Sequence, residues 1–221
     1  MNTYTFTLAG AKLVALPSGA LWWPDEALLC VSDLHLGKSE RIARNGGALL
    51  PPYETRDTLF RLDADIRETT PRTVVCLGDS FDDLDAANAL TEEQTLWITR
   101  LMAGRRWIWI EGNHDPGPID FGGMHLAELH TPPLYFRHIA RFGTSAEVSG
   151  HFHPKASVSR RGHRLTRPCF LLDSDRVILP AYGTYTGGLH SDHEALNKLM
   201  RAEALAILLA KPPHPIPMPR S

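Results

Sequence analysis

The sequence predicts a layered α/β sandwich, and three patterns support this fold class. Short apolar runs typical of buried strands alternate with helical patterns through the middle of the chain. Strand patterns also occupy both ends, an order typical of helices packed against a sheet core. The 221 residues, 43% of them hydrophobic, suffice for one domain with a substantial core.

The first half of the chain alternates predicted strands with two predicted helices. Leu59, Leu62 and Ile66 share one helical face after Pro51-Pro52, and Pro71 ends that helix. Thr91 and Gln94 fit a capping box at the start of the second helix, which Gly104 closes. The strands expected around these helices are Tyr4–Leu8, Leu13–Leu16, Ala20–Trp23, Ala27–Val31, Thr73–Leu77 and Arg106–Ile110.

The second half returns to strands and adds a third helix. We expect the helix over Glu194–Ala210 and a turn at Asp173-Ser174-Asp175. Residues 1–210 are expected to form the single domain, and the proline-rich segment 211–221 a disordered tail. The strands expected here are Leu134–Arg137, Ala146–Val148, Cys169–Leu172 and Arg176–Leu179.

Composition restricts the possible functions. The net charge of −2 argues against binding nucleic acid through bulk charge. The sequence shows no signal peptide and no run of the ~20 apolar residues that span a bilayer, which indicates a cytoplasmic protein without membrane contact. Cys30, Cys76 and Cys169 lie far apart in apolar stretches and are expected to be reduced thiols. The oligomeric state is not readable from the sequence.

Four polar clusters each follow a predicted strand. Because sites in open α/β sheets form at the carboxyl ends of strands, the four clusters could converge at one edge. Each cluster alone also fits an ordinary turn, helix cap or solvated loop, but all four in this order leave those roles little room. The clusters are Asp33 with His35, Gly78-Asp79, Gly112-Asn113-His114-Asp115 and Gly150-His151-Phe152-His153.

The donor types indicate the metal chemistry. Aspartate, histidine and asparagine without cysteine favour hard or borderline divalent ions, of which Mn²⁺ is expected first and Fe²⁺ or Zn²⁺ next. Two such ions ~3.5–4 Å apart can clamp a phosphoryl group and activate a water molecule. The pattern therefore predicts a two-metal phosphoesterase.

These motifs resemble the calcineurin-like metallophosphoesterase superfamily, whose fold is a four-layer α/β/β/α sandwich with two mixed sheets. The resemblance implies that Asp33, His35 and His153 bind one metal, that Asn113 and His151 bind the other, and that Asp79 bridges both. The resemblance also requires one further histidine between the third cluster, Gly112-Asn113-His114-Asp115, and the fourth, Gly150-His151-Phe152-His153. His125, His130 and His138 compete for that role; we choose His138, which ends a strand-like segment, and expect the other two to be surface loop histidines.

The residues His114 and Asp115 have predicted catalytic roles. His114 is expected to face the phosphate, where it would stabilise charge or protonate the leaving oxygen. Asp115 is expected to orient His114, and it could also cap a helix.

The flanking sequences narrow the resemblance to bacterial ligase-associated DNA damage response endonucleases, the PdeM group. They include Leu36-Gly37-Lys38, Phe136-Arg137-His138 and Leu179-Pro180-Ala181-Tyr182-Gly183. This resemblance implies cleavage of DNA, single-stranded in the first instance, and repair partners such as a ligase or helicase. Lys38, Arg160, Arg161 and Arg164 are candidate substrate contacts, although they also fit a solvated helix face and a hairpin edge.

Two other functions stay open. One is a phosphodiesterase or pyrophosphatase for small nucleotides or lipid-linked substrates, although no long insertion that would cover a lipid is seen. The other is a binding scaffold on the same fold, which the complete ligand set argues against. The sequence does not separate DNA from RNA.

Overall fold

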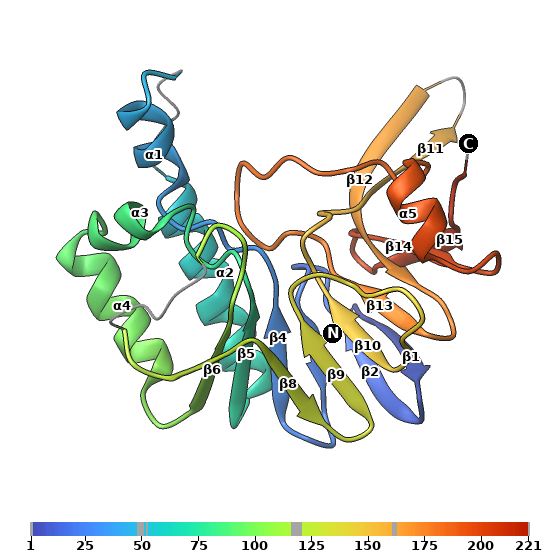
Figure 1. The fold of residues 1–221 in the computed structure, drawn as a ribbon, viewed down its shortest axis with the longest axis horizontal. Coiled ribbons are helices and arrows are strands. Elements are labelled where there is room, and N and C mark those ends of the chain that lie inside the picture. The colour runs from blue at the N-terminus through green and yellow to red at the C-terminus, as the bar shows by residue number, and fades with distance from the viewer. Residues whose placement is uncertain (1, 48–50, 52, 116–120, 161–162, 221) are drawn as a thin grey trace.

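Two β-sheets pack face to face in the computed structural model, which describes residues 2–47, 51, 53–115, 121–160 and 163–220 (Figure 1). Buried side chains from both sheets, such as Val75, Ile108 and Phe136, form the core between them. None of the helices in this described part of the chain combines the length and the apolar character that crossing a membrane requires.

The first sheet is mixed and contains the strands that lead into most of the candidate site. Strands β1 to β4 pair antiparallel in sequence order, whereas β4 to β7 run parallel. Parallel strands need crossover connections, and the helices α1 to α4 lie in them. The strands are β1 (Tyr4–Leu8), β2 (Ala11–Ala15), β3 (Leu21–Trp23), β4 (Leu28–Val31), β5 (Thr73–Leu77), β6 (Arg106–Ile110) and β7 (Met124–Leu126).

The second sheet is also mixed, because β10 runs parallel to both β9 and β13 while the other pairs are antiparallel. Its order is β15-β14-β12-β13-β10-β9-β8, and β11 pairs with β12 in a hairpin that projects beyond the sheet (Figure 1). The strands are β8 (Glu128–Thr131), β9 (Leu134–Arg137), β10 (Glu147–Ser149), β11 (Lys155–Arg160), β12 (His163–Leu172), β13 (Arg176–Ile178), β14 (Leu205–Leu208) and β15 (His214–Pro217).

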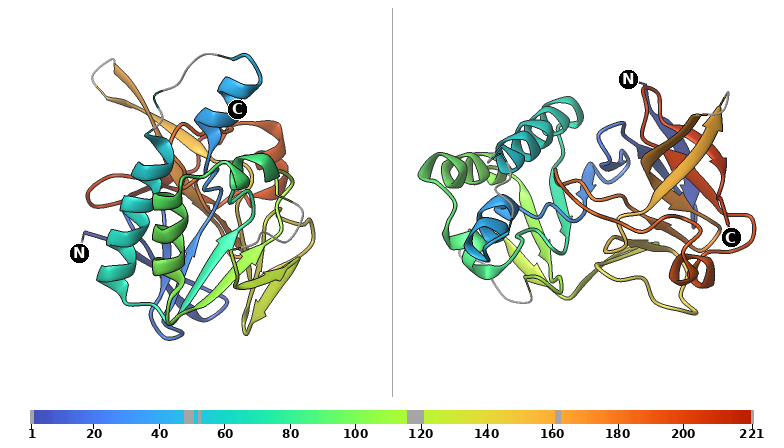
Figure 2. Two further views of the ribbon diagram at one scale, coloured as in Figure 1. Left: turned by 90° about the vertical axis from the view of Figure 1, so that its left-hand side faces the viewer. Right: turned by 90° about the horizontal axis from the view of Figure 1, so that it is seen from above.

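Helices cover the outer faces of both sheets, which completes the predicted four-layer α/β/β/α sandwich (Figure 2). On the first sheet, Leu59 and Leu62 of α2 and Ile98 of α4 pack with Val74. On the second sheet, Leu196 of α5 packs with buried strand residues. The helices are α1 (Lys38–Arg44), α2 (Glu54–Thr69), α3 (Leu84–Asn88), α4 (Glu92–Met102) and α5 (Glu194–Leu199).

The C-terminal region corrects two predictions. The expected helix over Glu194–Ala210 ends at Leu199, and Leu205–Leu208 instead forms β14, which pairs with β12. The expected disordered tail contains β15, whose His214 lies opposite Leu208. Strand pairing with distant segments therefore outweighs the local pattern in both places. The three cysteines are buried free thiols, as predicted.

Candidate metal centre

Five loops converge at one edge of the two sheets. Three of them follow the parallel strands β4, β5 and β6, and two follow β9 and β10. Backbone hydrogen bonds join the loops: Asp33 N–H donates to Gly78 O at 3.2 Å and Gly150 N–H donates to His138 O at 2.9 Å. The predicted convergence of the four polar clusters is therefore present, with the His138 loop as the fifth member.

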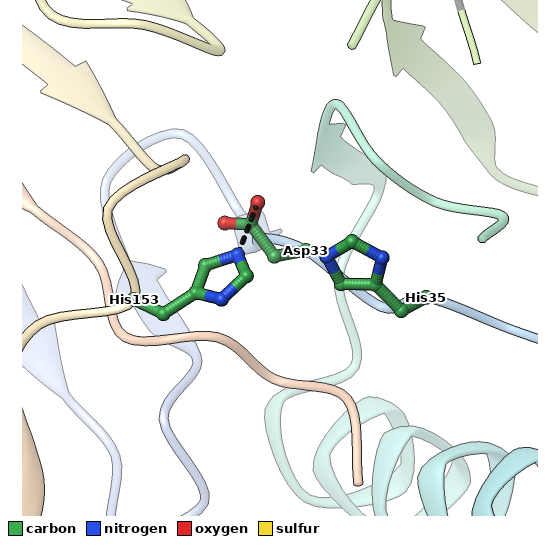
Figure 3. Close-up of side chains that lie close together, drawn as sticks. All are labelled: Asp33, His35 and His153. Carbon is green, nitrogen blue, oxygen red and sulfur yellow. Dashed lines mark ion pairs between the residues drawn. The ribbon is translucent and has the colours of Figure 1, made fainter. Parts of the chain in front are cut away.

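The first side-chain cluster consists of Asp33, His35 and His153, whose ligand atoms all lie within 4.8 Å of one another. Figure 3 shows the three side chains turned toward one another, with His153 reaching Asp33 from the loop after β10. The His153 Nε2 atom lies 2.9 Å from Asp33 Oδ1. Burial alone would raise the pKa of Asp33, but His153, His138 and Ser32 outweigh burial and lower it, so that the carboxylate is charged.

The second cluster surrounds the Nε2 atom of His138. This atom lies 3.0 Å from Asn113 Oδ1, 3.3 Å from Asp79 Oδ2 and 3.3 Å from His151 Nδ1. The His138 Nδ1–H donates to Leu77 O at 2.8 Å, which leaves Nε2 as the atom facing the other donors. Asp79 groups with this cluster, and its role as a bridge between two metals stays a prediction.

The first cluster fits a divalent cation because its buried donor atoms are poorly satisfied by the described residues. Within the described part of the chain, His35 Nε2 has no partner, and Asp33 Oδ1 and His153 Nε2 have only their mutual 2.9 Å contact; all three atoms belong to the first cluster. A poorly satisfied buried polar atom is costly, and here three such atoms lie within 4.8 Å of one another. Carboxylate oxygen and imidazole nitrogen suit Mn²⁺, Fe²⁺ and Zn²⁺.

The backbone at the site adopts conformations that non-glycine residues rarely adopt. Asp33, His35, Asp79, His151 and His153 all have positive φ, between 44° and 70°. Each such residue costs about 1–3 kcal/mol, so the surrounding structure must hold it there. Five of the seven candidate ligands carry this strain, which is the pattern of a site shaped for function rather than for stability.

Two glycines of the predicted motifs allow the loops to meet. A Cβ atom at Gly78 would lie 2.5 Å from the His138 ring, and one at Gly150 would collide with Ser32 Oγ. Both positions therefore exclude a side chain, which explains the glycine in Gly78-Asp79 and in Gly150-His151.

Asp82 is a site residue that the sequence analysis missed. Its fully buried carboxylate lies 2.8 Å from His35 Nδ1, and it also contacts Arg41 and Lys38. The hydrogen bond places the proton on His35 Nδ1 and turns Nε2 toward the first cluster. The signal that could have revealed Asp82 is the second acidic residue three positions after Asp79.

His114 is near both clusters, but the predicted role of Asp115 is wrong. The Asp115 carboxylate accepts backbone N–H groups of Asp79 at 2.9 Å, Ser80 at 2.7 Å and Phe81 at 3.2 Å, so that it anchors the β5 loop. The His114 Nδ1 atom instead lies 3.0 Å from Asp82 O. Burial and the Asp79 charge raise the pKa of Asp115 to about 6, although the backbone N–H donors lower it.

The competing histidines lie apart from the clusters. His125 belongs to β7 and stacks on Trp109, and His130 belongs to β8 and stacks on Tyr135, so both lie in strands rather than in the expected loops. Neither is part of a group of potential metal ligands among the described residues. The structure thus favours His138 over both.

The lysine and arginine side chains that are predicted to contact the substrate differ in their surroundings. Lys38 places its amino group 3.4 Å from Asp82 Oδ1, so that Asp82 partly neutralises it. Arg164 lies exposed on the β11–β12 hairpin and forms no ion pair within the described part of the chain. Arg160 ends β11, while Arg161 falls outside the described residues.

Comparison with known proteins agrees with this geometry. The model of the calcineurin-like phosphoesterase family matches residues 27–168, a range that contains every candidate metal ligand. The chain is similar to a solved structure described as Pseudomonas putida nuclease MPE, with 27% identity and a TM-score of 0.76 over 97% of this chain and 100% of that chain. The comparison with curated proteins returns no match. The chain belongs to the calcineurin-like phosphoesterase family and is a metal-dependent phosphoesterase.

Proposed function

We propose that this protein is a two-metal nuclease that hydrolyses phosphodiester bonds of single-stranded DNA. The observation that carries the proposal is the pair of adjoining clusters: one gathers the buried donor atoms of Asp33, His35 and His153, and the other is built around His138 Nε2. Asp33, His35 and His153 would hold one ion, and Asp79, Asn113, His138 and His151 the other.

The cations, when bound, supply Lewis-acid stabilisation of phosphoryl charge and lower the pKa of water. Mn²⁺ is the proposed ion, with Fe²⁺ or Zn²⁺ as alternatives, because the donor set has no thiolate. The protein contributes charged carboxylates: His138 and the His114 backbone N–H outweigh burial and lower the pKa of Asp79. Neutralising these carboxylates with two divalent ions leaves a positive site for a phosphodiester.

His114 is the proposed general acid. Its Nδ1–H faces the carbonyl oxygen of Asp82, which fixes the ring and leaves Nε2 as the atom that can exchange a proton with substrate. The ring contacts His35 edge to face, with centroids 5.2 Å apart, and is thereby held beside the first cluster. In this position His114 can protonate the leaving oxygen as the ester bond breaks.

A nucleic-acid substrate is supported by two observations. The similar structure is described as a nuclease and aligns along nearly the whole chain. The hairpin that follows His153 also carries the exposed cations Arg164 and Arg167, which lack carboxylate partners among the described residues and suit a phosphate backbone. The proposed place in DNA repair, beside a ligase or helicase, rests on the sequence resemblance alone.

The test is a nuclease assay with Mn²⁺ on single-stranded DNA, duplex DNA, single-stranded RNA, and cyclic and pyrophosphate nucleotides. We expect the wild type to cleave single-stranded DNA fastest. We expect Asp79→Asn to lose both its metal content and its activity. Asp25→Asn is the matched control, because Asp25 is an exposed aspartate. Turnover confined to small nucleotides would assign the enzyme to a different class of phosphodiesterase.

A further inference from the structure

Two neighbouring cavities lie on the His138 side of the candidate metal centre. A first cavity of about 420 Å³ is lined by the candidate ligands Asn113 and His138 and by Ile139 and Ala140. A second cavity, also about 420 Å³, shares Ile139 and Ala140 with the first and is lined in addition by Phe142 and Phe152. We call this second space the Phe142 cavity. Ile139 and Ala140 line both cavities, so the metal ligands lie next to an apolar wall.

Two apolar side chains of the Phe142 cavity are unusually exposed for their type. Phe142 is 68% exposed and Ile139 is 43% exposed. The Phe152 ring contacts the His151 ring edge to face, with centroids 5.0 Å apart, which connects the cavity directly to a candidate ligand. Contiguous exposed apolar surface beside a polar site is characteristic of a binding surface.

Two buried charged side chains, Glu147 and Arg176, hold the loop that presents Phe142. The fully buried Glu147 carboxylate accepts the Arg141 N–H at 3.0 Å and the Thr144 hydroxyl at 3.1 Å. Buried Arg176 donates to Arg141 O at 3.0 Å and to Thr144 O at 2.9 Å. Buried charges are costly, and these fix both flanks of an exposed phenylalanine. The exposure is therefore a built feature of the loop.

The charges near the Phe142 cavity are already paired, which argues against a phosphate ligand there. Of the residues that line it, Lys198 places its amino group 2.5 Å from Glu194 Oε1; Arg141, which lines the first cavity, lies 3.1 Å from Glu128 Oε2. An apolar space whose charged residues are paired suits the base of a nucleotide, which is flat and uncharged. Bases of a single strand are free to leave their neighbours and stack on aromatic rings, whereas duplex bases are not.

We propose that the Phe142 cavity binds a nucleobase of the single-stranded substrate by stacking and apolar contact while the adjoining phosphate lies at the metal centre. This inference rests on the proposed nuclease function and extends it, because it supplies a physical cause for a preference for single strands. Ile139 forms the ridge between the phosphate and the base, and Phe142 offers the stacking face.

The test compares Phe142→Ala, Phe142→Trp and the control Phe60→Ala on two single-stranded substrates. One is an oligothymidylate, and the other is an abasic strand of equal length and charge. Phe60 is 69% exposed on α2, so its truncation removes an equally exposed ring from a different surface. Thermal melting of each variant verifies that the fold is retained.

We expect Phe142→Ala to lower kcat/KM on oligothymidylate about tenfold, mainly through KM, as for the loss of one base–aromatic contact. Cleavage of the abasic strand should change less than twofold, and Phe142→Trp should restore cleavage of oligothymidylate. Equal loss on both strands, or no loss on either, would overturn the inference while leaving the nuclease function intact. A wild-type protein that cleaves neither strand would overturn the proposed function and this inference with it.

Discussion

The Nδ1 atom of His35 lies 2.8 Å from the Oδ1 atom of Asp82, and Asp82 has no exposed surface. Lys38 and Arg41 contact the same carboxylate. These partners and His35 outweigh burial and keep the pKa of Asp82 below its usual value, so that a buried negative charge holds the imidazole. A carboxylate behind a metal-binding histidine fixes the ring and makes it a better ligand.

Replacement of Asp82 by asparagine should therefore weaken metal binding without removing a ligand. We expect Asp82→Asn to reduce Mn²⁺ affinity by about 10–100-fold, the range for loss of such supporting carboxylates. Titration with Mn²⁺, followed by calorimetry, measures the change. Asp85→Asn is the control, because Asp85 is exposed and its carboxylate pairs with Arg44 rather than with a candidate ligand. Unchanged affinity in Asp82→Asn would contradict the supporting role.

Asp115→Asn should destabilise the protein, since one amide oxygen cannot replace a carboxylate that accepts several buried backbone N–H groups. We expect a loss of about 2–3 kcal/mol in the free energy of unfolding, because hydrogen bonds to a charged group are involved and N–H groups are left unsatisfied. Urea denaturation measures it, with Asp25→Asn as the reference. A variant as stable as the wild type would show that the β5 loop does not depend on this anchor.

His114→Ala should separate catalysis from metal binding. The variant is expected to keep its metal content and to lose about 10²–10⁴-fold in kcat, the usual contribution of a general acid. Metal analysis and steady-state kinetics give the two readouts. His214, exposed on β15, supplies the matched histidine-to-alanine control. If His114→Ala retains full activity, another group supplies the proton.

Metal affinity should rise with pH because of His138. Burial opposes its protonated form, but Asp79 and Asp33 outweigh burial and raise the pKa above the ordinary value of 6.5. Metal must displace that proton, so that affinity increases as pH rises through the raised pKa and binding releases a proton. The stability of the metal-free fold has the opposite pH dependence. The stabilisation from the contacts of protonated His138 with Asp79 and Asp33 is complete below pH 6.5 and is lost as pH rises through the raised pKa of His138.

Calorimetric titrations with Mn²⁺ between pH 6 and 8, repeated in buffers of different ionisation enthalpy, test this prediction. The number of protons released should fall toward pH 8 as affinity rises. Melting of chelator-treated protein over the same range provides the second readout. An affinity that is constant with pH, together with no proton release, would contradict the prediction.

Local sequence patterns correctly predict those elements whose ends are marked by residues close by in the sequence. Strands β5, β6 and β9 have the predicted bounds, because each is an apolar run between turn residues. The capping box of Thr91 and Gln94 is formed as expected, since both partners lie within one turn. The polar loops of the site could be predicted because each directly follows such a strand.

Features that depend on distant partners could not be predicted. Leu205–Leu208 is a short apolar run that fits helix or strand, and pairing with β12 decides for the strand. The contact of Asp82 with His35 spans 47 positions, so that the sequence shows an acidic residue after Asp79 but not its histidine partner. The roles of Glu147 and Arg176 likewise emerge only where β10 and β13 pair.

The arrangement of two cations is the central claim, and anomalous diffraction from Mn²⁺-loaded crystals tests it most directly. We expect two peaks, one among Asp33, His35 and His153 and one among Asp79, Asn113, His138 and His151. A single peak, or peaks away from these side chains, would contradict it.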